Sequence, residues 1–126
     1  NVIAETASSL IQINAIDFTI KKDIEIGTIG DFYNPIRLAI SSDGKTLYYL
    51  EAEGVYKHSI DDLNPSGLVF IEGTFYGLDV DPKDNTIYAL KEKGFDADGY
   101  AFRYQEDGMM IDSIKVGIGP NGAAFN

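Results

Sequence analysis

The sequence predicts an all-β fold, and an internal repeat is the main reason. The segment LAISSDGKTLYYLEAEG, residues 38–54, returns without a gap as LDVDPKDNTIYALKEKG, residues 78–94. A weaker echo relates residues 34–40 to residues 119–125. A period of about 40–45 residues, made of short alternating strands and Gly/Asp turns, is typical of the blades of a β-propeller.

The composition agrees with a globular β protein. The hydrophobic fraction is 44%, and 8 tyrosines and 7 phenylalanines suit pleated, half-buried surfaces. No apolar run approaches the roughly 20 residues that a membrane helix needs. The net charge of −10 repels phosphate backbones and anionic lipids, which argues against nucleic-acid binding. The absence of cysteine excludes disulfides, thiolate metal sites and cysteine nucleophiles.

The strands are predicted in order along the chain. Residues 2–5 and 9–14 form a predicted strand pair, and residues 23–27 form a third strand. The first complete four-strand set is 37–41, 46–50, 55–60 and 68–72, and the second is 77–81, 86–90, 100–105 and 110–116. Residues 122–125 form a single closing strand. The turns at 42–44 and 82–85 contain the Ser, Asp, Gly, Pro and Asn that favour tight turns.

We interpret residues 1–126 as a single β-propeller segment of about three four-stranded antiparallel blades. Residues 1–33 form a partial blade, 34–73 and 74–117 form two blades, and 118–126 hold an inner strand that completes another blade. A closed ring typically needs four to eight blades, and an open arc exposes bare blade faces. The predicted partner is therefore the rest of a ring, supplied by another chain, a cleaved N-terminal portion or a second copy. Since the chain starts at Asn1 without a signal peptide, we interpret it as a processed product or a fragment. The resemblance described below favours the C-terminal portion of a longer propeller over two associating copies.

Four motifs carry a resemblance to a known family. They are FYGLDVDP at 75–82, TIY at 86–88, FRYQEDG at 102–108 and IDSIKVGIGP at 111–120. In this order they resemble the last blade of the YncE-like, YVTN-repeat propellers, in particular exported bacterial lipoproteins with the DUF5074 domain. Residues 34–62 resemble the preceding blade, and residues 1–33 match only by strand pattern.

The resemblance implies a typically seven-bladed protein of the cell envelope, at the outer-membrane surface or in the periplasm. Members carry a lipidated N-terminal cysteine, which this chain lacks. Better-understood relatives capture cobalamin and pass it to a TonB-dependent outer-membrane transporter. The resemblance supplies no catalytic motif.

The search for catalytic residues centres on His58, the only histidine. It shares a predicted strand face with Tyr56 and Ile60, and it aligns with Tyr104 of the next blade. We favour a packed structural position over a general base or a metal ligand. The sequence contains no set of zinc-ligating residues and no Ser-His-Asp triad with a nucleophile elbow. We therefore do not expect an enzyme of the lactonase or quinoprotein-dehydrogenase kind.

The densest carboxylate motif is FDADG at 95–99, an insertion relative to the preceding blade. Asp96 and Asp98 offer the hard oxygens that calcium prefers. The motif departs from the EF-hand register, so a solvated polar loop is the favoured interpretation and no cofactor is predicted.

The candidate ligand-binding residues lie in loops that crowd one face of a propeller. These are Phe32, Tyr33, Arg37, Phe75, Tyr76, Phe95 and Asn121. Aromatic rings beside a few polar groups suit a flat, partly apolar ligand. The alternative is that Tyr33 and Tyr76, at matching blade positions, pack between blades.

The predicted function is non-catalytic ligand binding by part of an exported cell-surface protein. The expected role is an accessory for uptake of a small organic ligand, such as a corrinoid, through a TonB-dependent transporter. The alternative is a protein-interaction scaffold in the cell envelope.

Overall fold

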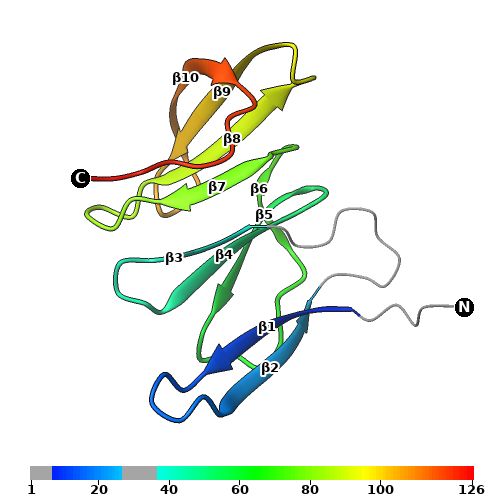
Figure 1. Cartoon of the computed structure of the whole chain (residues 1–126), viewed down its shortest axis with the longest axis vertical. Coiled ribbons are helices and arrows are strands. Elements are labelled where there is room, and N and C mark those ends of the chain that lie inside the picture. The colour runs from blue at the N-terminus through cyan, green and yellow to red at the C-terminus, as the bar shows by residue number, and fades with distance from the viewer. Residues whose placement is uncertain (1–6, 27–36) are drawn as a thin grey trace, which may run out of the picture.

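The computed structural model describes residues 7–26 and 37–126. Within these residues the regular structure consists of strands in three antiparallel sheets, without a helix. Figure 1 shows the sheets following one another along the long axis, in chain order. The all-β prediction with four-stranded antiparallel blades is confirmed, and no sheet of the described chain closes on itself. This part of the chain also offers no membrane-spanning helix.

The first sheet is a hairpin of β1 (Ser8–Ile13) and β2 (Ile20–Ile26). Side-chain oxygens of Asn14 and Asp17 accept hydrogen bonds from backbone N–H groups within the connecting turn, at 3.1 and 3.0 Å. β2 begins three residues before the predicted strand, because its consecutive lysines hide the alternating pattern. The predicted strand at residues 2–5 lies outside the described residues.

The second and third sheets are four-stranded meanders that confirm the two predicted strand sets. The second contains β3 (Leu38–Ile40), β4 (Thr46–Glu51), β5 (Gly54–Ser59) and β6 (Val69–Glu72). The third contains β7 (Gly77–Val80), β8 (Ile87–Lys93), β9 (Ala97–Tyr104) and β10 (Met110–Ile118). The expected loop at 95–99 is instead largely part of a longer β8–β9 hairpin, since Lys93 pairs with Ala97.

A short turn connects the first two strands of each large sheet, β3 to β4 and β7 to β8, at matching positions of the repeat. Asp43 accepts hydrogen bonds from the Ser41 hydroxyl at 2.7 Å and from the Lys45 N–H at 3.0 Å. These bonds lower the pKa of Asp43 because they favour its ionised form. The two turns also meet, because the amide oxygen of Asn85 accepts the Ser42 N–H at 2.8 Å. This contact fixes one end of the third sheet against the second.

The core lies between the sheets. β4 is sandwiched, with Tyr48 buried on one face and Tyr49 on the other, because successive side chains of a strand alternate. The Tyr48 face packs against Leu78, Val80, Ile87, Ala89 and Tyr104 of the third sheet. The Tyr49 face packs against Leu10, Ile24 and Ile26 of the hairpin. Face-to-face packing of successive sheets is the arrangement expected of propeller blades.

The C-terminal residues run past the last sheet without strand pairing. The expected strand at 122–125 is not formed, because the described chain holds no further strand of that blade with which it could pair. The segment nevertheless lies beside β7 (Figure 1), where the Ala123 N–H donates to the Asp79 carboxylate at 2.6 Å. The rings of Phe125 and Tyr88 are 5.2 Å apart.

Candidate functional site

Three of the predicted ligand-binding residues meet on one surface. Arg37 precedes β3, Tyr76 precedes β7, and Phe95 lies in the β8–β9 turn. The Arg37 guanidinium lies 5.7 Å from the centre of the Tyr76 ring, and its Nε donates to the Tyr76 carbonyl at 3.2 Å. The Tyr76 and Phe95 rings meet edge to face at 5.1 Å. We call these three residues the arginine–aromatic cluster.

The backbone holds Phe95 in an unusual conformation. Its φ of 61° lies in the left-handed region, which is uncommon for a bulky residue. The side chain remains 55% exposed, although its ring touches Tyr76 and lies against Gly119, where an added Cβ would be 3.2 Å from it. Strained backbone of this kind occurs at ligand sites and also in ordinary turns, as at Phe18 with its φ of 58°.

The remaining predicted ligand residues are placed differently. Phe75 packs against the core beside Phe102 and Tyr104, with ring centres 6.1 and 6.5 Å away. Asn121 is exposed, and its backbone lies so close to Gly77 that an added Cβ there would be 2.6 Å from it. Asn121 therefore borders the residue that follows Tyr76. Phe32 and Tyr33 lie outside the described residues.

The two candidate calcium ligands are only partly available. Asp98 forms an ion pair with Lys115 at 2.8 Å and lies in β9, opposite Ile118, rather than in a loop. Asp96 shares a shallow hollow with Asp98, Lys93 and Lys115, so two ammonium groups face two carboxylates. Among the described residues no group of three His, Cys, Asp or Glu side chains could hold a metal ion.

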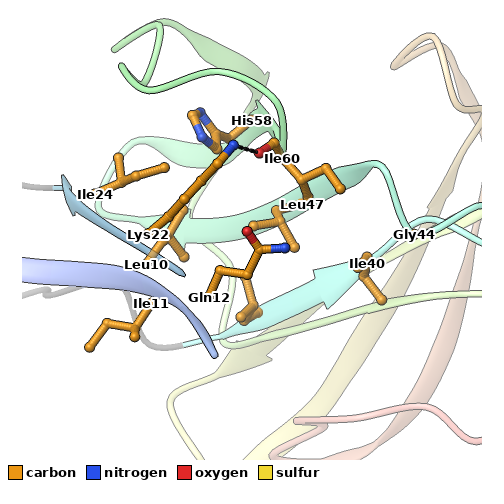
Figure 2. A pocket seen from close by; sticks show the side chains of 11 residues that line it. Leu10, Ile11, Gln12, Lys22, Ile24, Ile40, Gly44, Leu47, His58 and Ile60 are labelled. Carbon is orange, nitrogen blue, oxygen red and sulfur yellow. Dashed lines mark hydrogen bonds between the residues drawn. The ribbon is translucent and has the colours of Figure 1, made fainter. Parts of the chain in front are cut away.

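The cavity between the hairpin and the second sheet was not predicted. It has a volume of about 190 Å³, and Figure 2 shows Gln12, Lys22 and His58 among its apolar side chains. His58 is only 3% exposed, and its Nε2 has no hydrogen-bond partner in the described protein. The predicted packed position of His58 agrees with its burial, but a fully packed imidazole would have both nitrogens satisfied or in solvent.

The sequence held one signal for this cavity. His58 stands where the repeated blade has Tyr104, so a smaller and more polar side chain replaces a large ring. Strand register supports the alignment, since Leu47 pairs with His58 in the second sheet and Ile87 pairs with Tyr104 in the third. Whether the space is refilled by neighbours depends on packing, which a single sequence does not give.

Burial makes three tyrosine hydroxyls harder to ionise. Desolvation raises the pKa of Tyr49 to about 12 and also raises that of Tyr48 and Tyr104, because burial disfavours the phenolate. These hydroxyls stay protonated at neutral pH. The arrangement suits binding by shape, charge and hydrogen bonds.

Comparison with known protein families identifies the family of this chain. Residues 1–115 match the family described as "Domain of unknown function (DUF5074)". Because the match spans most of the sequence, the chain belongs to this family. No curated protein matches the chain. The DUF5074 part of the expected resemblance is confirmed, and membership of the YncE-like, YVTN-repeat group stays a prediction.

Proposed function

We propose that this protein is a non-catalytic ligand-binding propeller portion of an exported cell-envelope protein. The arginine–aromatic cluster carries the proposal. Residues from three separate connections converge there, and the structure holds one of them exposed despite a left-handed backbone. The cluster presents two aromatic rings and one guanidinium group. The rings offer area for stacking and the guanidinium offers a positive charge, and the rigid rings lose little conformational entropy when a ligand binds.

The cluster favours a flat ligand with a polar edge. A planar conjugated molecule would stack on the exposed ring of Phe95, which stands at 84° to the Tyr76 ring, and an acceptor group on its edge would meet the Arg37 guanidinium. A corrinoid has this character, and the family resemblance noted above supplies the same candidate. In this proposal the protein captures the ligand at the outer-membrane surface and passes it to a TonB-dependent transporter.

Cyanocobalamin binding, followed by equilibrium dialysis and absorbance, tests the proposal. We expect wild-type protein to retain the corrinoid, and Tyr76→Ala to lose at least about tenfold in affinity, equivalent to 1.4 kcal/mol. Phe95→Gly should weaken binding similarly while relieving backbone strain.

Phe18→Gly is the matched control. Phe18 is also a turn phenylalanine with positive φ, at 58°, and is 79% exposed, but it makes none of the cluster's contacts. Its substitution should leave binding unchanged. Absence of corrinoid binding by the wild type, or equal losses in the Phe18 and Phe95 variants, would contradict the proposal.

A protein-interaction scaffold is the second candidate function. Leu38 and Ile40 of β3 are exposed, whereas the matching Leu78 and Val80 of β7 are buried against the second sheet. An apolar strand face of this kind favours a protein partner such as further blades or another envelope protein. Pull-down of a defined envelope partner that Leu38→Asp abolishes, without corrinoid binding, would favour this function instead.

A further inference from the structure

The cavity beside the first hairpin is separate from the arginine–aromatic cluster, since none of the three cluster residues lines it. It is a half-open hollow between β1 and β2 on one side and β3, β4 and β5 on the other (Figure 2). Its lining residues Ile11, Leu38 and Ile40 are at least half exposed. Its walls are mainly aliphatic. They include Leu10, Ile24, Leu38, Ile40, Leu47 and Ile60.

The side chains of His58 and Lys22 add polar nitrogen groups to this mainly apolar cavity. His58 is buried and its Nε2 has no hydrogen-bond partner among the described residues, so the nitrogen is available to a ligand. Lys22 reaches into the same space and donates to the Ile60 carbonyl, which uses one of the three N–H donors of its ammonium group. The Gln12 amide supplies a further polar group in the lining.

The charge in the cavity is positive. Among the described residues the ion pairs are Arg103 with Asp112 and Lys115 with Asp98, so Lys22 has no carboxylate within salt-bridge distance there. A half-buried ammonium beside an unpartnered imidazole attracts an anionic group instead.

At the equivalent position of the third sheet, a protein side chain fills the space that is empty beside His58. In the third sheet Tyr104 occupies the position of His58, is buried, and packs against Phe75. Here the histidine replaces that ring, and space remains. At about 30 Å³ for each water molecule, the cavity has room for about six waters or for an organic acid of similar bulk.

The geometry points to a binding site for a small monocarboxylate with a compact, branched apolar body. One carboxylate oxygen would accept from the remaining N–H groups of Lys22, the other from His58 Nε2–H in the tautomer that protonates this nitrogen, and the aliphatic walls accept the hydrocarbon part. A phosphate is a poorer match, because it is strongly hydrated and the walls offer few further donors. A divalent metal would find no set of anionic ligands among the described residues.

NMR titration of the full chain with 4-methylpentanoate tests this site. We expect saturable shifts at the methyl groups of Ile24 and Leu47 and at the His58 ring. The neutral isostere 4-methylpentanamide should bind at least about tenfold more weakly, because it lacks the charge that Lys22 attracts.

Two lysines on one strand give a matched pair of variants. Lys22→Gln should reduce carboxylate affinity about tenfold, whereas Lys21→Gln makes the same charge change at an exposed side chain that does not line the cavity and should leave affinity unchanged. His58→Tyr introduces the residue of the repeated blade, so it should fill the cavity and abolish binding without lowering the thermal unfolding midpoint.

Three results would overturn the assignment: no shift with tens of millimolar carboxylate, equal affinity for acid and amide, or equal losses in the two lysine variants. If the His58→Tyr variant does not fold, the comparison of Lys22→Gln with Lys21→Gln still tests the proposal. Because the variants leave Arg37, Tyr76 and Phe95 intact, failure here does not affect the corrinoid test, and failure of that test does not affect this one.

Discussion

Gly54 illustrates how one residue determines local structure in this chain. Its φ is 152°, and a Cβ placed on it would lie 2.0 Å from the Ile71 carbonyl oxygen and 3.1 Å from Val69 Cγ1. The clash is with backbone of the neighbouring strand β6, which cannot move without breaking the pairing of β5 and β6. A glycine is therefore required where the β4–β5 turn enters the sheet.

Gly54→Ala should lower the free energy of unfolding by about 3 kcal/mol or more, through backbone strain and overpacking. Urea unfolding followed by circular dichroism measures the change. Gly117→Ala is the control, since no atom lies within 4 Å of its added Cβ, and its effect should stay within about 0.5 kcal/mol. Equal stability of the two variants would contradict the predicted clash.

At the scale of single residues, the sequence predicts surface loops better than cavities. Loop position and residue type were enough to group Arg37, Tyr76 and Phe95, which the structure brings together. The same reasoning assigned Phe75 to the ligand surface, although its ring packs against the core. The cavity beside His58 exists because the neighbouring side chains leave space unfilled around the imidazole. Residue composition and spacing do not predict such unfilled space.

At the scale of elements, the repeat predicts strand number and order well, and strand ends less well. Both four-strand sets follow from alternating residues and turn chemistry, because each strand must present one face to a neighbouring sheet. The β8–β9 hairpin extends further than predicted because Asp98 pairs with Ile118 of β10. Its charged residues have the composition of a loop, and pairing with β10 overrides that local preference.

β9 and β10 are also joined by side chains. Arg103 Nε donates to the Asp112 carboxylate at 2.7 Å, and a second guanidinium nitrogen contacts the other carboxylate oxygen. Hydrogen bonding to Arg103, followed by its positive charge, lowers the pKa of Asp112 below its usual 3.8 in the folded protein. A carboxyl group with a lowered folded-state pKa stabilises the fold above its unfolded pKa, and the contribution disappears as the pH falls through the folded value.

Asp112→Asn should therefore lower the thermal midpoint at neutral pH, and its difference from wild type should shrink as the pH falls below about 3.8. Because the pair is exposed, the effect should be small. Melting curves between pH 7 and 3 measure it. Asp62→Asn, which makes the same charge change away from β9 and β10, controls for overall charge. A difference that persists unchanged in acid would contradict the ion-pair explanation.

At the scale of the whole molecule, the described chain is a series of three sheets, and the first sheet covers the second less fully than the second covers the third. Leu38 is 58% exposed, whereas Leu78, at the matching position of the next sheet, is 3% exposed. The difference follows from position, because the second sheet covers Leu78 and no described strand covers Leu38 in the same way. This asymmetry supports the proposal that further blades, from another chain, a cleaved portion or a second copy, complete the structure.

Leu78→Ala should cost about 2–5 kcal/mol of unfolding free energy, since it leaves a cavity between two sheets. Leu38→Ala in the isolated chain should cost less than about 1 kcal/mol. Chemical unfolding at low protein concentration, with native mass spectrometry to verify the oligomeric state, compares the two. Equal losses in the monomer would contradict the described exposure, and a mass of two chains would identify the second copy as the covering partner.

The sandwiched strand β4 has a consequence for cooperativity. Its two buried tyrosines belong to two different clusters, so the molecule has successive interfaces in place of one shared interior. Stability in such an array is a sum of sheet and nearest-neighbour terms, as in repeat proteins. We therefore expect the hairpin to separate at milder denaturing conditions than the two large sheets, and to open the space beneath it without global unfolding.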